Sequence, residues 1–337
     1  MLWVMHARYR HEMSIIRRAV TIFGMLLASS ALAADPLPPP PADPLTVEVE
    51  TGDADRFATL FEATGGKPSA ERLQHDYLDR GSYGVHVFTP NRIVDATNLA
   101  RRIAAKPDVY ARAIRTCLPI VKQTTAELRA TYLALHGLFP DKSLPRLFLV
   151  VGAGNSGGTA APGAQVLGLE VLCRGAATPD ALRAIVRGFY AHETTHALQG
   201  GLPAGDILLA SVLQEGAADF IAELATGRPM DQARADWATP REVELWKQFE
   251  TDLKATRGVK AEDDLTRGTP AGDAFYRWIA NHNSAPAGWP GEAGYWMGQR
   301  IWQRWYDKQP DKRAALREML VLRNPEAILA AGTFQAN

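Results

Sequence analysis

Residues 178–201 read TPDALRAIVRGFYAHETTHALQGG, and this stretch decides the fold that we expect at the centre of the chain. Thr178 is a good helix N-cap, Pro179 suits the first helical position, and Asp180 places a negative charge in the first turn. Two glycines end the stretch, where helices commonly stop. We therefore expect a single helix here, with residues four apart on one face.

This helix carries the motif HETTH, from His192 to His196. Two histidines four residues apart reach one metal ion from one helix face. Zinc suits this arrangement because it accepts nitrogen and oxygen ligands and leaves a position open for water. Glu193 lies beside the histidines, where a carboxylate takes the proton of the water that attacks. The motif therefore predicts a catalytic Zn²⁺ site.

A second helix, expected over about residues 206–227, supplies the third ligand. The turn at residues 200–205 returns this helix alongside the first, so Glu215 faces the two histidines. Asp219 follows four residues later on the same face. Because a ligating histidine usually gives its other N–H to a carboxylate or a carbonyl, we expect Asp219 to hold His192.

The HETTH motif with Glu215 and Asp219 downstream resembles the gluzincin group of metallopeptidases, the thermolysin-like plan. Four segments in this order, LFLVVGAGNSGGTA, HETTHALQ, EGAADFIAELATG and GYWMG, also resemble bacterial domains known as predicted zinc-dependent proteases, near the gliding-motility GldB-like proteins. The resemblance covers about residues 55–335. It implies a mainly helical α+β, zincin-like domain with a small sheet and an active-site helix.

The gluzincin plan also implies an extended strand edge above the metal, where a peptide substrate pairs through its backbone. A glycine-rich segment precedes the helix in the right order, and glycines allow close approach of another backbone. A flexible surface loop explains this segment equally well. The candidate substrate-binding residues are Asn155, Ser156, Gly157, Gly158 and Thr159.

The group that stabilises the developing oxyanion has two candidates. Tyr295, between Gly294 and Gly298, would present its hydroxyl to the site, although an aromatic in a tryptophan-rich helix more often belongs to the core. His282, in the sequence NHN, is the second candidate, and a histidine in such a loop is more often simply exposed.

Two apolar runs predict buried strands, residues 147–151 and 166–172. The glycines between them spell GxGxxG at residues 152–157. A dinucleotide site needs a helix that opens at the third glycine, and the sequence that follows contains a proline and has no helical period. We therefore exclude a dinucleotide-binding fold.

The N-terminus has the form of a secretory signal peptide, residues 1–34. Arg17 and Arg18 precede a short apolar run at residues 19–27, and the small residues that follow end in ALA at 31–33. Met13 makes residues 1–12 a candidate start-site artefact. A proline-rich linker is expected at 35–52, followed by one metallopeptidase domain at 53–337 with helical N- and C-terminal parts. The mature protein is therefore expected in the periplasm or secreted.

The composition of the chain argues against some classes of binding partner. Apolar residues make up 46% and charged residues 22% of the 337 residues, and the formal net charge is zero, so no basic surplus favours nucleic acid. No stretch after the leader is apolar enough to span a membrane. In an oxidising compartment Cys117 and Cys173 either form a disulfide or remain two buried thiols, and the sequence leaves both open.

The sequence therefore predicts hydrolysis of peptide bonds in a peptide or protein substrate. Two alternatives belong to other classes: an envelope assembly factor that keeps zinc for structure, and a peptide-binding module that uses only the strand edge. Glu193 favours the enzyme, because neither metal ligation nor folding requires it. The oligomeric state and the choice between endo- and exopeptidase action stay open.

Overall fold

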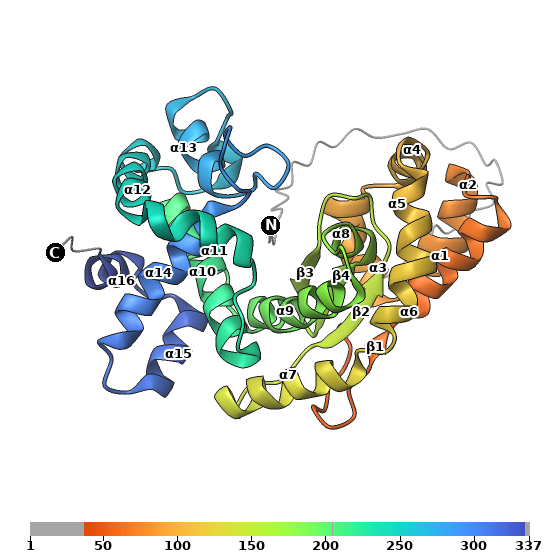
Figure 1. The fold of residues 1–337 in the computed structure, drawn as a ribbon, viewed down its shortest axis with the longest axis horizontal. Helices are drawn as coiled ribbons and strands as arrows, with labels where there is room; N and C mark the ends of the chain where they lie inside the picture. Colours follow the sequence, from red (N-terminus) through yellow and green to blue (C-terminus); the bar gives the residue numbers. More distant parts are fainter. Residues whose placement is uncertain (1–36, 204, 334–337) are drawn as a thin grey trace, which may run out of the picture.

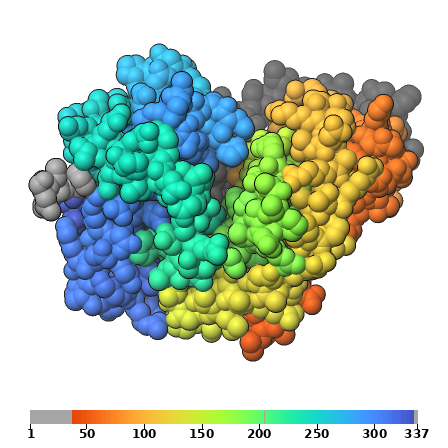
Figure 2. All heavy atoms as spheres, in the orientation of Figure 1, coloured from red at the N-terminus to blue at the C-terminus, as the bar shows by residue number. Residues whose placement is uncertain are grey.

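The computed structural model describes residues 37–203 and 205–333, and the protein is mainly helical with one small sheet (Figure 1). This is the α+β class that the sequence predicts. The predicted signal peptide, residues 1–34, lies outside the described residues. We call residues 37–203 the N-terminal half and residues 205–333 the C-terminal half; they occupy opposite sides of the molecule (Figure 2).

The sheet has four strands in the order β1-β2-β4-β3. The first three strands are parallel, and β3 pairs antiparallel with β4 at the edge of the sheet. Their bounds are β1 Val49–Glu50, β2 Arg146–Val150, β3 Gly158–Ala161 and β4 Ala164–Gly168.

Two sequence predictions about the strands are wrong in part. The second predicted strand, residues 166–172, ends at Gly168, and the chain continues as helix α8, Leu169–Arg174. The linker predicted at 35–52 contains β1, and Val47 and Val49 are buried, so the fold begins before residue 53. These residues belong to the fold because β1 extends the sheet beside β2 and the two valines join the hydrophobic core.

Helices in the N-terminal half surround the sheet. Phe57, Tyr77 and Tyr110 form an aromatic cluster between them, with ring centroids 5.3 Å and 6.1 Å from that of Phe57. The helices before the sheet are α1 Gly52–Ala63, α2 Ala70–Leu73, η1 Gln74–Leu78, α3 Tyr83–Phe88, η2 Thr89–Ile93, α4 Ala96–Ala105, α5 Pro107–Arg112, η3 Ala113–Cys117, α6 Leu118–Val121 and α7 Thr125–Leu138.

Helix α9, Pro179–Leu198, is the predicted HETTH helix and packs against β3 and β4. The Thr178 hydroxyl caps it by accepting from the N–H of Ala181 at 3.1 Å. All residues from Tyr190 to His196 are buried, because the sheet lies on one side of the helix and the C-terminal half on the other.

Helix α10, Ile207–Thr226, packs beside α9 as the sequence predicts. Asp206 caps its start by accepting from the N–H of Leu209 at 3.0 Å, and Gly227 ends it in the left-handed conformation. Its first sixteen residues are all buried, which explains why this helix is apolar on nearly every face.

The remaining helices of the C-terminal half enclose α10. Gly216 of α10 and Gly298 of α14 meet backbone to backbone, so these two helices cross at close range. The elements are α11 Gln232–Ala238, η4 Thr239–Arg241, α12 Glu242–Thr256, η5 Glu262–Asp264, α13 Pro270–Trp278, α14 Ala293–Asp307, α15 Lys312–Val321 and α16 Pro325–Gly332.

Cys117 and Cys173 form a disulfide, with their Cα atoms 5.8 Å apart. The bond joins the end of η3 to α8 and resolves the choice that the sequence left open. Within the described part of the chain, no helix combines the length and apolar character needed to cross a bilayer.

Candidate metal centre

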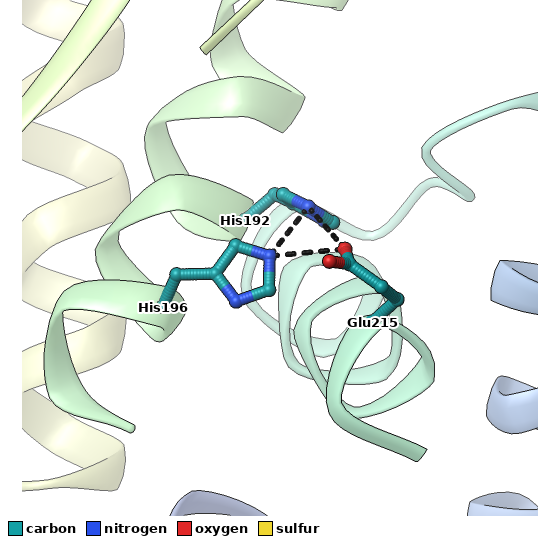
Figure 3. A group of neighbouring side chains, drawn as sticks. All are labelled: His192, His196 and Glu215. Carbon is teal, nitrogen blue, oxygen red and sulfur yellow. Dashed lines mark hydrogen bonds and ion pairs between the residues drawn. The ribbon is translucent and has the colours of Figure 1, made fainter. Parts of the chain in front are cut away.

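Three side chains converge between α9 and α10. His192 and His196 project from α9 toward Glu215 of α10 (Figure 3). The Nε2 atoms of the two histidines are 3.0 Å apart, and Glu215 Oε2 lies 3.1 Å from His196 Nε2 and 3.5 Å from His192 Nε2. The structure thus brings together the three predicted metal ligands, and all three are buried.

The orientation of His192 is set by Asp219. Asp219 Oδ1 lies 2.9 Å from His192 Nδ1, the contact that the four-residue spacing of α10 predicts. The other oxygen of Asp219 accepts from Arg234 Nη2 at 2.7 Å. Because Arg234 fixes its carboxylate, Asp219 accepts a hydrogen bond from the Nδ1–H of His192, and the Nε2 lone pair faces the cluster.

The orientation of His196 is set by Gln199, which sequence reasoning missed. Gln199 Oε1 lies 2.7 Å from His196 Nδ1, while Gln199 Nε2 donates to the carbonyls of Gln214 at 3.1 Å and Met319 at 3.3 Å. Two carbonyl acceptors fix the amide so that its oxygen faces the histidine. His196 therefore donates from Nδ1 and also turns the lone pair of Nε2 inward.

This arrangement fits a metal cation. Each neutral imidazole carries its hydrogen on Nδ1, so Nε2 carries a lone pair. Two such lone pairs and a carboxylate oxygen then face one another, and no hydrogen atom lies between them. Ligand atoms about 2.0–2.1 Å from a tetrahedral zinc lie about 3.3–3.4 Å from one another, close to the separations of 3.0, 3.1 and 3.5 Å here. Nitrogen and oxygen donors of this kind suit Zn²⁺.

Electrostatics favour a positive charge at the same point. Burial by itself lowers the pKa of His192, but hydrogen bonds to Asp219 and Glu215 raise it to about 10. Burial opposes ionisation of Glu215, yet the adjacent histidines hold its pKa well below its usual range. The cluster thus favours a cation at its centre, which a proton or a metal ion supplies.

Glu193, the predicted general base, is buried between α9 and the edge strand β3. A Cβ atom at Gly158 would collide with the Glu193 carboxylate, so the strand backbone lies directly against this side chain. The Glu193 charge also contributes to the raised pKa of His192. The carboxylate therefore lies beside the ligand cluster without belonging to it.

The predicted substrate segment spans a loop and the edge strand. Asn155, Ser156 and Gly157 precede β3, whereas Gly158 and Thr159 open it. The sequence expectation of a strand edge in this place is met from Gly158 onward. Asn155 is exposed, and Thr159 is buried.

The GxGxxG segment leads into β3 and does not open a helix. Its N–H groups serve a different purpose: Gly152 and Gly154 each donate to the carboxylate of Glu170 at 3.0 Å. Burial raises the pKa of Glu170, and these two donors oppose that shift. The loop thus folds around an internal carboxylate and not around a phosphate.

Tyr295 lies at the cluster. Its ring is parallel to that of His192, with centroids 5.9 Å apart, and the Arg234 guanidinium lies 5.0 Å from its ring centroid. Burial and the carboxylates of Glu215, Glu292 and Asp219 raise its pKa well above the usual value, so its hydroxyl keeps a proton to donate. The other candidate, His282, is an exposed loop residue.

A cavity of about 340 Å³ lies elsewhere, along η1, α3 and η2. No predicted site residue lines it, so this cavity is separate from the group of His192, His196 and Glu215. The residues around the cavity are Gln74, Leu78, Asp79, Gly81, Val85, His86, Thr89, Val94 and Asp95.

Comparison of the chain with protein-family models, with curated proteins and with solved structures finds no match. The function therefore has to be inferred from the site itself.

Proposed function

We propose that this protein is a zinc-dependent hydrolase of peptide bonds, or of a closely related amide, with a zincin-like active site. The observation that carries the proposal is the convergence of His192, His196 and Glu215 beside the Glu193 carboxylate. A zinc site that serves only the fold has no need of a buried carboxylate next to its ligands, because burying a charge is costly.

Each residue has a role in this reaction. Bound zinc, held by His192, His196 and Glu215, would supply a Lewis acid that makes a water molecule more acidic and polarises the substrate carbonyl. Glu193 accepts the proton of the attacking water and delivers it to the nitrogen of the leaving amine. Asp219 keeps the ring of His192 in place.

Two further features support a peptide substrate. The edge strand β3 offers backbone N–H and C=O groups to an extended chain, and its first residue lies against Glu193. In this proposal residues 155–159 bind the substrate. The protonated hydroxyl of Tyr295 donates to the carbonyl oxygen as that oxygen becomes negative.

We also propose that the protein works in the periplasm or outside the cell. The disulfide between Cys117 and Cys173 supports this location, because such bonds persist mainly in oxidising compartments. The charged and apolar pattern of residues 1–34 is the second support.

The test of the proposal is the variant Glu193→Gln. It keeps the size of the side chain and removes the base, so zinc content and folding should stay unchanged. Hydrolysis should fall by about 10²–10⁴-fold, the usual contribution of a positioned general base. Zinc stoichiometry by metal analysis and turnover on a peptide found in a cleavage library measure both effects.

The matched control is Glu244→Gln, which removes an exposed carboxylate from α12. This variant should cleave like the wild-type protein. Equal turnover of Glu193→Gln and wild type would contradict the mechanism. A zinc-loaded wild type that cleaves no peptide in the library would favour the role of a zinc-bearing scaffold.

A further inference from the structure

Glu170 is a fully buried carboxylate outside the metal centre, and no step of the proposed reaction uses it. It lies in the first turn of α8, which follows β4 directly. Both of its oxygens accept hydrogen bonds from the loop before β3: Oε2 from the N–H of Gly152 and Oε1 from the N–H of Gly154, each at 3.0 Å. Hydrogen bonds to a carboxylate are among the stronger ones in proteins, so this pair fastens the loop to α8.

The loop has the shape that this contact requires. Gly152 leaves no room for a side chain, because a Cβ atom there would lie 2.5 Å from the ring of Phe88 and 3.2 Å from Glu170 Oε1. Gly154 has φ 77°, a left-handed conformation that glycine adopts without strain. Two of the three glycines in the GxGxxG segment thus serve the contact with Glu170.

Helix α8 is itself held at its other end. Cys173 of α8 is joined to Cys117 of η3 by the disulfide, and Arg112 Nη1 donates to the Cys173 carbonyl at 2.6 Å. Arg112 also donates to the carbonyl of Ala176, just after the helix. Glu170 therefore projects from a fixed helix, and the loop takes its position from that helix.

The fastened loop leads directly into the edge strand β3. Few residues separate Gly154 from Gly158, the first residue of the strand, and the Ser156 hydroxyl among them donates to the Gly158 carbonyl at 2.7 Å. The backbone at Gly158 lies against the carboxylate of Glu193. A shift of the loop at Gly154 would therefore move the edge of the strand relative to the proposed general base.

We propose that Glu170 is a positioning residue for the substrate: it holds the loop so that β3 presents its edge to an extended peptide beside the metal centre. This inference rests on the proposed hydrolase function and adds a residue that sets its preference for long peptides. A strand edge pairs with a partner over several consecutive residues, so a substrate with few residues gains little from it. Glu170 acts through the loop and touches no reacting atom.

The test compares two substrates that share one cleaved bond: an N-acetylated, C-amidated peptide of about eight residues, and a capped dipeptide too short to pair along β3. In Glu170→Gln an NH₂ group replaces one acceptor oxygen, so one loop N–H loses its partner. We expect KM for the long peptide to rise on the order of tenfold, equivalent to about one hydrogen bond, at unchanged kcat. The rates on the dipeptide and the zinc content should stay those of wild type.

The matched control is Asp252→Asn, which changes a buried carboxylate in α12 of the C-terminal half. Asp252 Oδ2 accepts from Arg277 Nε at 3.0 Å and from Trp278 Nε1 at 2.8 Å, so this variant also loses a buried acceptor. It should lower the midpoint of urea denaturation and leave the rates on both substrates unchanged. A loss of stability alone is thereby distinguished from a displaced strand.

A second variant covers the case in which Glu170→Gln does not fold. Gly154→Ala strains the loop at its positive φ without a steric clash, since the nearest atom to the added Cβ would be Tyr110 Oη, 3.9 Å away. The strain disfavours the backbone conformation that points the Gly154 N–H at Glu170. The same selective rise in KM for the long peptide is therefore expected.

Hydrogen exchange of the zinc-loaded protein without peptide separates this inference from the function on which it rests. The amides of β3 should exchange about tenfold faster in Glu170→Gln than in Asp252→Asn or wild type, because the strand loses its anchor. If wild type cleaves neither substrate, the hydrolase proposal fails, and the exchange rates still decide whether Glu170 holds the strand. Exchange of β3 at the wild-type rate, or an equal rise in KM for both substrates, would overturn the role of Glu170.

Discussion

At the scale of single residues, the proposed metal ligands His192 and His196 are oriented by side chains outside the ligand cluster. Asp219 and Gln199 each accept a hydrogen bond from the Nδ1–H of one histidine, and this contact turns the Nε2 lone pair toward Glu215. A histidine free to rotate or to change tautomer would lose part of its affinity for the metal, because only one arrangement presents the lone pair.

We therefore expect Asp219→Asn and Gln199→Met each to weaken zinc binding by about ten- to a hundredfold. The first introduces an amide N–H₂ group among the donors of Arg234 and His192, and the second removes the acceptor of His196. Titration with a competing chelator measures the affinity. Gln232→Met, at an exposed position, is the control, and affinities equal to that of this control would contradict the role of both residues.

The sequence predicts the ligands at this scale but only part of their support. His192, His196, Glu215 and Asp219 follow from fixed helical spacings, since residues four apart share a face. Arg234 reaches Asp219 from another helix, and no local period relates the two. Gln199 follows His196 by only three residues and was predictable in principle, because a polar side chain one turn away can reach the ring.

At the scale of elements, the helix ends were predictable and one strand end was not. Thr178, Asp206 and Gly227 are capping residues whose chemistry is local, and they set the bounds of α9 and α10. The run after Gly168 is apolar and suits a strand or a buried helix equally. The chain turns into α8 there, where the Glu170 carboxylate accepts from the loop at Gly152, a contact distant in sequence.

The crossing of α10 and α14 gives a prediction at this scale. A Cβ at Gly298 would collide with the carbonyl of Val212, and backbone atoms cannot give way as a side chain does. Gly298→Ala should therefore lower the free energy of unfolding by about 1–3 kcal/mol, as overpacked sites do. It should also lower turnover, because α10 carries Glu215 and α14 carries Tyr295. Urea denaturation measures the stability.

Gly137→Ala is the matched control for this substitution. Gly137 is exposed in α7, and nothing lies within 4 Å of the Cβ that alanine would add. Alanine there should be neutral or stabilise the protein by about 0.5–1 kcal/mol, because it removes the entropic cost of a helical glycine. A Gly298→Ala protein as stable as this control would show that the two helices tolerate a wider crossing.

At the scale of the whole molecule, the site is assembled where the two halves meet. The N-terminal half contributes α9 with both histidines and Glu193, together with the edge strand β3, and the C-terminal half contributes Glu215 and Tyr295 (Figure 1). The mainly helical α+β class was expected from the resemblance that the sequence motifs carry. The way the halves pack was not, since it depends on contacts such as Gly216 against Gly298, between residues far apart in sequence.

The disulfide gives the prediction that belongs to the whole molecule. It closes a loop across a sequence separation of 56 and joins η3 to α8, while both helices that carry the candidate ligands lie outside that loop. The variant with Cys117→Ser and Cys173→Ser should lose about 2–4 kcal/mol of stability, because the unfolded chain gains freedom. Its zinc affinity should stay that of wild type. Denaturation with and without a reductant checks this, since reduced wild type should match the variant, and equal stability of oxidised and reduced wild type would contradict the prediction.

Thiol labelling of the protein from its own host should find both cysteines blocked if the protein is exported, whereas two free thiols in the native host would speak against the proposed compartment.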